Sequence, residues 1–251
     1  MLAFALVYQD IHRLTGKHLR KIEMVTHQPL FAGRNSYMTL LCLALLVESA
    51  LWSDALLGQP ADQARDAVRV GDRWVYDTKD EITGFAKATY SQVVTEVSPK
   101  EVVLNLTVRG QNGSTLLVYD HDWNRIEQSN VKFRPNDGQG IRLPLAVGKE
   151  WRAEYEARPT QTGAASKGSV LSKVVGRETV TTPAGTFDTF KIETRVQNIN
   201  TSDPSQLSQY ENVIWFAPQV NHWVRRKLVT KIRNRTTADT SEELTDFSRN
   251  F

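Results

Sequence analysis

Alternation of apolar and polar residues with a period of two constrains the fold of this chain more than any other feature. In residues 102–108 (VVLNLTV), the first, third, fifth and seventh residues are all valine or leucine. A strand with one apolar and one polar face is typical of an antiparallel sheet that packs one side against a core. Beyond residue 66, no stretch of ten residues carries the apolar spacing of an amphipathic helix. The pattern therefore predicts an all-β fold.

Turn residues separate the alternating stretches at intervals of about eight to twelve residues, which is typical of barrels and sandwiches. Asn112-Gly113 is a strong hairpin signal, because a type I′ turn needs positive φ angles that these residues tolerate. No linker is long enough to separate two domains. We expect a single all-β domain over residues 66–251, an antiparallel β-barrel or half-barrel or sandwich of about 9–11 strands.

Residues 1–65 are expected to form an N-terminal extension, helical in part, with a signal peptide at about 38–55 followed by a linker. The apolar run Met38–Val47 follows Arg34, and Ser53 and Ala55 place small residues before a cleavage site. A membrane-spanning helix needs roughly twenty apolar residues, so no transmembrane span is expected in the mature protein. The protein is then periplasmic or otherwise exported, or cytoplasmic if this segment is an ordinary helix.

Charge and cysteine content exclude several classes of function. Lys and Arg number 31 against 28 Asp and Glu, a formal net charge of +3, and so even a balance does not indicate a nucleic-acid-binding protein. The single cysteine, Cys42, lies in the N-terminal extension. The predicted domain therefore has no disulfide, thiol nucleophile or thiolate metal ligand, and no cofactor is expected.

Motifs of catalytic and metal sites are absent from the sequence, so we expect a non-enzymatic protein with no catalytic residues and no metal. Two alternatives stay open. Asp120-His121-Asp122 has the residue types of a metal site, although neighbours in a strand point to opposite faces. A hydrolase would instead bring Asp120 or Asp122 to His222, which is distant in the sequence.

Tryptophans of the domain are candidates for the walls of a ligand cavity. The predicted domain has five tryptophans. Trp74, Trp151, Trp215 and Trp223 are taken as candidate ligand-binding residues, and Trp123 is left aside. Large aromatic side chains suit a hydrophobic or amphiphilic ligand such as a lipid. They can equally fill the core of a barrel of this size.

The stretch from residue 223 to residue 235 is strongly basic. Arg225, Lys227, Lys231 and Arg233 share one parity with Trp223, which predicts a common strand face. This face is a candidate site for an anion or an acidic envelope partner. The alternative is a solvent-exposed strand whose charges discourage aggregation between sheets.

Two hairpins carry a resemblance to a known family. The first is TPAGTF (residues 182–187), followed by an aromatic residue and lysine; the second is WFAPQV (residues 215–220), followed by Asn221 and a basic strand. Over about residues 175–235 they resemble a family of exported bacterial β-barrel-like proteins of unknown function. The family usually has glycine at the position of Asn221, and asparagine tolerates the same positive φ. The resemblance implies an antiparallel barrel in the bacterial envelope and brings no catalytic residues.

Together these features favour a non-enzymatic protein of the bacterial envelope whose β-domain binds a hydrophobic or amphiphilic ligand, or an envelope partner. A structural or interaction module that uses the basic strand face is one alternative. A hydrolase with a site not evident from the sequence is the other. An apolar cavity inside the barrel would favour the first interpretation.

Overall fold

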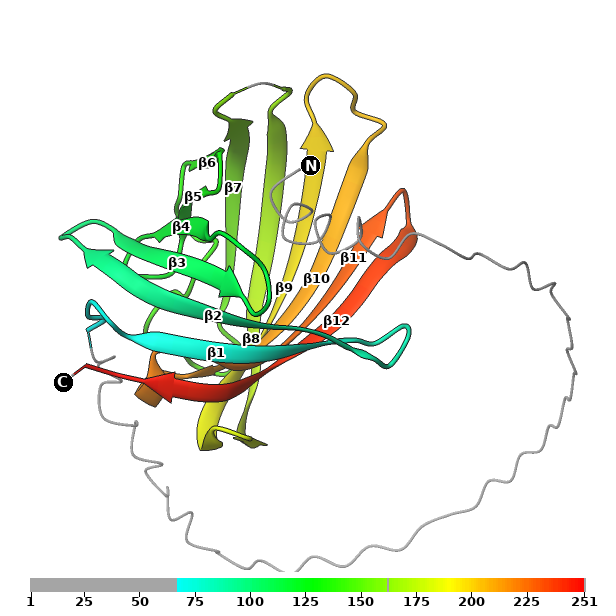
Figure 1. The fold of residues 1–251 in the computed structure, drawn as a ribbon. Helices are drawn as coiled ribbons and strands as arrows, with labels where there is room; N and C mark the ends of the chain where they lie inside the picture. The colour runs from blue at the N-terminus through cyan, green and yellow to red at the C-terminus, as the bar shows by residue number, and fades with distance from the viewer. Residues whose placement is uncertain (1–66, 162, 251) are drawn as a thin grey trace, which may run out of the picture.

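The computed structural model describes residues 67–161 and 163–250, which form a closed barrel of twelve antiparallel strands (Figure 1). Each strand pairs with its neighbours in the sequence, and β12 pairs with β1. The strands are β1 (Arg73–Asp80), β2 (Ala86–Val97), β3 (Val102–Val108), β4 (Thr115–Tyr119), β5 (Arg125–Gln128), β6 (Val131–Arg134), β7 (Glu150–Pro159), β8 (Ser166–Thr182), β9 (Gly185–Asn200), β10 (Leu207–Ala217), β11 (His222–Ile232) and β12 (Arg235–Ser248). A short 3₁₀ helix, η1 (Pro218–Val220), precedes β11.

The predicted antiparallel all-β fold is confirmed, with twelve strands in place of about nine to eleven. The extra strands come from β5 and β6, whose four residues each are too few to show a clear alternation. The proposed signal peptide at about 38–55 and the domain boundary near residue 66 lie outside the described residues. Within 67–161 and 163–250, no helix has the length and hydropathy of a membrane span.

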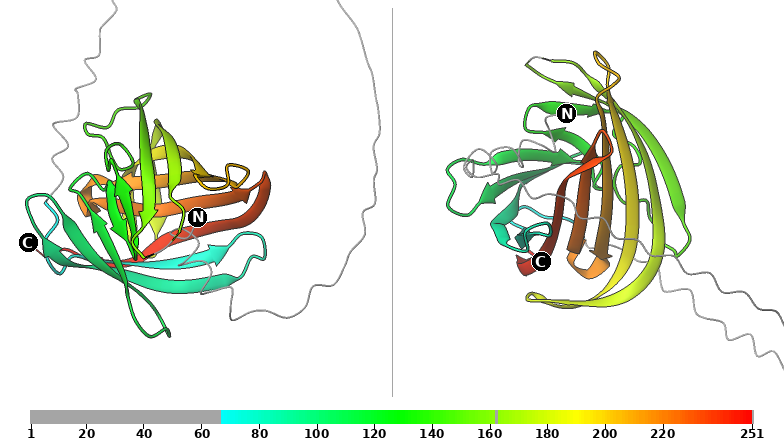
Figure 2. Two further views of the ribbon diagram at one scale, coloured as in Figure 1. Left: turned by 90° about the horizontal axis from the view of Figure 1, so that it is seen from above. Right: turned by 90° about the vertical axis from the view of Figure 1, so that its right-hand side faces the viewer.

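Strand length differs strongly around the barrel. β8 and β9 have 17 and 16 residues, whereas β4, β5 and β6 have five, four and four. Figure 2 shows the long β8–β9 hairpin curving along one side of the molecule. Its turn is the TPAGTF segment. Thr182 pairs with Gly185, whose φ of 138° is a value that glycine adopts readily. The predicted turn residues therefore lie at the tip of the longest hairpin.

Large buried side chains fill one end of the barrel. We call this end, where the turns β2–β3, β8–β9 and β10–β11 lie, the packed end. Trp74 near the start of β1, Phe187 at the start of β9, Phe216 at the end of β10 and Val220 in η1 are all buried there. The opposite end carries the turns β1–β2, β7–β8, β9–β10 and β11–β12, and we call it the cavity end.

A β-bulge in β11 changes which of its residues face the interior. Phe216 pairs with Trp223 but Trp215 pairs with Arg225, so Val224 is the extra residue. Trp223 and Arg225 share a parity in the sequence, yet the bulge places them on opposite faces of the sheet. Beyond the bulge, Arg226 points into the barrel.

The two ends of the described chain meet at one buried carboxylate. Asp72 accepts hydrogen bonds from the backbone N–H of Arg69 at 3.0 Å and of Asn250 at 2.8 Å. The guanidinium of Arg249 forms an ion pair with the same group at 2.9 Å, and the Asp72 and Arg249 side chains are 0% and 4% exposed. Asp72 thus joins the entry of β1 to the exit of β12 where the barrel closes.

Replacing Asp72 by alanine is expected to lower the free energy of unfolding by about 3–5 kcal/mol, because it leaves the Arg249 guanidinium buried without its carboxylate. Urea denaturation monitored by tryptophan fluorescence measures the loss. The matched control is Asp246→Ala, which removes an exposed ion pair with Arg73 on the same two strands. That change should lower stability by less than about 1 kcal/mol. Equal losses would contradict the role given to Asp72.

Candidate functional site

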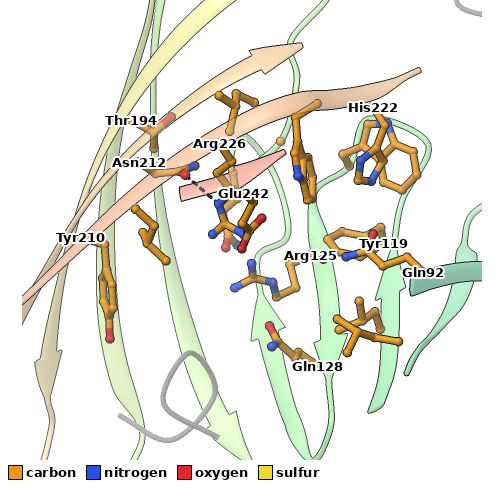
Figure 3. Close-up of a pocket in the computed structure, with 18 of the residues that line it drawn as sticks. Gln92, Tyr119, Arg125, Gln128, Thr194, Tyr210, Asn212, His222, Arg226 and Glu242 are labelled. Carbon is orange, nitrogen blue, oxygen red and sulfur yellow. Dashed lines mark hydrogen bonds and ion pairs between the residues drawn. The ribbon is translucent and has the colours of Figure 1, made fainter. Parts of the chain in front are cut away.

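A cavity of about 230 Å³ lies inside the barrel between the packed end and the cavity end (Figure 3). Most of its wall is apolar or aromatic, and the side chains come from nearly all strands. Its apolar and aromatic lining includes Tyr90, Leu106, Leu117, Tyr119, Trp123, Ile141, Tyr155, Val170, Ile192, Tyr210, Ile214, Phe216, Trp223 and Leu228. A concave apolar site with a few polar groups is the usual form of a small-molecule site.

The loop between β6 and β7 supplies part of this wall. Its Ile141 N–H donates to the carbonyl of Asp122 at 2.6 Å, and its Gly140 N–H donates to Asn124 at 2.6 Å. A Cβ atom at Gly140 would lie only 2.0 Å from the Asp122 carbonyl, so this close approach requires glycine. The packing of this loop on the β4–β5 turn brings Gln139 and Ile141 to the cavity.

A charged cluster lies in the middle of the cavity wall. Arg226 of β11 and Glu242 of β12 are cross-strand partners whose side chains lie 3.6 Å apart and are 15% and 12% exposed. Arg226 Nε donates to Asn212 at 2.9 Å, and the Tyr90 hydroxyl donates to Glu242 at 2.8 Å. Burial, followed by the Glu242 carboxylate, raises the pKa of Tyr90 well above its usual value, so the hydroxyl keeps its proton. The Arg226 guanidinium also lies 5.6 Å from the ring centre of Trp223.

Two further basic side chains line the cavity. In Figure 3 Arg125 of β5 extends toward the Arg226–Glu242 pair, and its guanidinium lies 5.2 Å from the ring centre of Phe133. Lys87 of β2 lines the wall near the cavity end. Burial lowers the pKa of Lys87, an effect that Asp80 partly offsets.

Three buried polar atoms of the lining have no hydrogen-bond partner within the described part of the chain. They are Gln92 Oε1, Gln139 Nε2 and Trp223 Nε1. Gln92 is only 4% exposed. Buried polar groups are nearly always hydrogen-bonded, so these three atoms are exceptions within the barrel.

His222 lies among the aromatic side chains of the packed end, beneath the charged cluster of Arg226 and Glu242. Its ring stacks on Trp74 with 4.6 Å between ring centres and meets Trp123 edge-on at 4.9 Å. Its Nδ1 atom lies 2.5 Å from the Tyr76 hydroxyl, which donates to the carbonyl of Trp223. Burial, followed by the charges of Arg226 and Arg249, lowers the pKa of His222 well below its usual value. The imidazole is therefore neutral at neutral pH.

The four tryptophans predicted to bind a ligand lie in three different places. Trp223 lines the cavity. Trp74 and Trp151 are buried in the core, and Trp74 Nε1 donates to the carbonyl of Val220 at 3.0 Å. Trp215 lies on the outside of the barrel, where Nε1 bonds to Glu178 and the Arg225 guanidinium lies over its ring. Trp123, which the sequence analysis left aside, joins Trp223 in the cavity wall.

The predicted basic face is present but largely neutralised by neighbouring strands. Arg225 pairs with Glu243 at 2.8 Å, Lys227 with Asp239 at 3.8 Å and Lys231 with Glu211 at 2.5 Å. Arg233 lies in the β11–β12 turn with a φ of 48°. Binding of an anion or acidic partner to this face stays a prediction.

The residues considered for a hydrolase or a metal site have separate structural roles. Asp120 accepts hydrogen bonds from Asn124 and Asn136 and holds the β4–β5 turn. His121 Nε2 lies 2.8 Å from the carbonyl of Ser98 in the β2–β3 turn, whereas His222 bonds to Tyr76 inside the barrel. In the ranges 67–161 and 163–250, no group of three histidine, cysteine or acidic side chains is placed to hold a metal ion.

The charged cluster was not among the sites predicted from the sequence. For Glu242, a signal was present: it occupies an inward position of β12 between Thr240 and Leu244, both buried. A carboxylate between two buried positions of one strand face indicates a polar group inside a barrel. Arg226 carries a similar signal, because it lies between Val224 and Leu228, both buried; the bulge in β11 only breaks its relation to the face of Trp223.

Buried neutral His222 should make the protein less stable as the pH falls below about 6.5, where the histidine of the unfolded chain takes up a proton and the native one does not. The free energy of unfolding should decrease by up to about 1.4 kcal/mol per pH unit in this range. Urea denaturation at about pH 7.5 and about pH 5.5 measures the change.

Two variants test this assignment. His222→Asn should flatten the dependence, whereas His121→Asn, at the exposed histidine of the β2–β3 turn contact, should keep it. If His222→Asn leaves the slope unchanged, the pH dependence has another origin.

Comparisons with known proteins found solved structures and one family that are similar to parts of this chain. No curated protein matches the chain. Solved structures that resemble this chain include the following three. A candidate lipoprotein of Parabacteroides distasonis is 15% identical with a TM-score of 0.47, covering 72% of this chain and 97% of its own. A candidate exported protein of Bacteroides fragilis with a YmcC-like fold is 16% identical with a TM-score of 0.49, covering 74% and 99%. The hypothetical lipoprotein YmcC of Escherichia coli is 10% identical with a TM-score of 0.44, covering 71% and 86%.

A family match falls on the segment that carries both predicted hairpins. The DUF3108-like family matches residues 162–227, which include TPAGTF and WFAPQV. The predicted resemblance to a known family is thereby confirmed, and over residues 162–227 this chain is similar to the DUF3108-like family.

Proposed function

We propose that this protein is a non-enzymatic β-barrel of the bacterial envelope that binds a hydrophobic or amphiphilic molecule inside the barrel. The observation that carries the proposal is the cavity of about 230 Å³ with its mainly apolar wall. Burial of apolar ligand surface against such a wall is the main source of affinity in small-molecule sites.

The arrangement of the interior supports binding from one end only. The packed end is filled by Trp74, Phe216 and Val220, so a molecule has no path through it. Thr78 and Lys87 line the cavity beside the β1–β2 turn and are only partly buried. The ligand therefore enters at the cavity end and stops above His222.

Location in the periplasm or another exported compartment is part of this proposal. It is supported by the signal-peptide pattern at about 38–55, and the cysteine-free stretch 66–251 is compatible with an oxidising compartment. The mature protein would need no membrane span, and its ligand would be a lipid or another amphiphile of the envelope.

The alternative functions have less support. An interaction module that uses the basic face is less favoured, because Arg225, Lys227 and Lys231 already pair with carboxylates. A hydrolase is less favoured, because His222 is engaged by Tyr76 among stacked rings and Asp120 holds a turn. Both His222 and Asp120 thus bond to other partners, which disfavours the acid–base pair between them that a hydrolase would need.

Filling the cavity should abolish ligand binding without unfolding the barrel. Ala88 lines the cavity on β2, and Ala88→Trp places an indole ring there. The neutral fluorophore N-phenyl-1-naphthylamine, titrated into the full chain, should bind at least about tenfold more weakly to this variant, since its apolar contacts are displaced.

The control is Thr89→Trp, one residue along β2. The Thr89 hydroxyl donates to Asp77 at 2.6 Å on the exposed outer face, so the added ring stays outside the barrel. This variant should bind the fluorophore like the unaltered protein. Equal binding by all three proteins would show that the cavity is not the binding site.

A further inference from the structure

We infer that the cavity selects an anionic amphiphile, whose head group lies between Arg226 and Arg125 and whose hydrocarbon chain lies against the apolar wall. The inference rests on the proposed function, which it narrows to a class of ligand. The shared head-group chemistry is a carboxylate or a phosphate ester. Both are planar or tetrahedral groups of oxygen acceptors that arginine binds well.

The charge of the lining is the first argument. Three basic side chains, Lys87, Arg125 and Arg226, line the cavity together with one acidic side chain, Glu242, and the Asp80 carboxylate acts on Lys87 from outside the lining. Guanidinium groups that face an apolar cavity favour an anionic ligand over a neutral or cationic one.

The positions of the two arginines are the second argument. Strands β5 and β11 lie on opposite sides of the twelve-stranded barrel, so Arg125 and Arg226 approach the cavity from opposite walls. Asn212 and Glu242 fix the orientation of the Arg226 guanidinium, and the Trp223 ring lies beneath it. Guanidinium groups held in place before binding lose little freedom when a ligand arrives.

The apolar part of the wall is the third argument. Leu106, Val170 and Ile192 line the cavity and offer an apolar surface to the hydrocarbon chain.

The size of the cavity limits the ligand to a small amphiphile. Its volume of about 230 Å³ lies below the roughly 300–1,000 Å³ of typical drug-sized sites. A single short acyl or alkyl chain suits this space better than a lipid with two long chains. We therefore assign a single-chain anionic amphiphile.

Isothermal titration calorimetry on the full chain, purified without detergent, tests the inference with four probes. Decanoate and decyl phosphate carry the two anionic head groups on one chain, decan-1-ol carries the chain alone, and acetate carries a head group alone. At least one anionic amphiphile should bind about tenfold or more tightly than decan-1-ol, since charge-assisted hydrogen bonds favour it. Acetate should bind far more weakly than decanoate. The preference between decanoate and decyl phosphate identifies the head group.

Three variants assign the effect to the charged cluster. Glu242→Gln removes the acidic residue while keeping an acceptor for Tyr90, and it should tighten binding of the anionic probes several-fold without changing decan-1-ol. Arg226→Gln should weaken the anionic probes about tenfold. Arg225→Gln is the matched control, because the neighbouring arginine faces outward and pairs with Glu243; it should leave all affinities unchanged. The gain expected for Glu242→Gln cannot come from misfolding.

The outcomes separate this inference from the proposed function. Equal affinity for decanoate, decyl phosphate and decan-1-ol would overturn the anionic selection and leave the binding of amphiphiles standing. Binding of none of the three would overturn both. Acetate bound as tightly as decanoate would reduce the site to an anion site with no role for the chain, and would also overturn both. Weaker binding of anions by Glu242→Gln would contradict the charge argument.

Discussion

Pairing between the first and last strands of the described chain is the interaction on which the rest of the barrel depends. Residues Arg73–Asp80 of β1 pair with residues Thr240–Ser248 of β12, and Asp72 ties the chain on both sides of this seam. Closure leaves neither strand with an unpaired edge. It also creates the interior, because Tyr90 of β2 reaches Glu242 of β12 only when β1 lies between them.

Unequal strand lengths divide that interior into a packed part and a hollow part. Long strands such as β8 and β9 carry core residues of the packed end, whereas strands β4 to β6 have only four or five residues each. Aromatic side chains around His222 form the floor of the cavity, and the β6–β7 loop completes its side.

The charged cluster is unfavourable for folding and is the part of the cavity proposed to bind a head group. Placing Arg226 and Glu242 at 15% and 12% exposure removes both from water, and similar apolar residues would often be at least as stable in such positions. Hydrogen bonds from Tyr90 and to Asn212 offset part of this loss. Local departures from the rules of stable packing of this kind are typical of functional sites. They explain why the cavity wall is the region where prediction from the sequence is least successful.

By itself, the sequence determined the antiparallel all-β fold, the TPAGTF turn and the similarity of residues 162–227 to a known family, because alternation and turn chemistry are local properties. Only the tertiary structure decided that the barrel closes, that Trp223 faces the cavity while Trp215 lies outside, and that Arg226 meets Glu242. These depend on register and on the bulge in β11, which are set by hydrogen bonds between strands. A one-residue change in register reverses every side chain of a strand, and no local pattern records it.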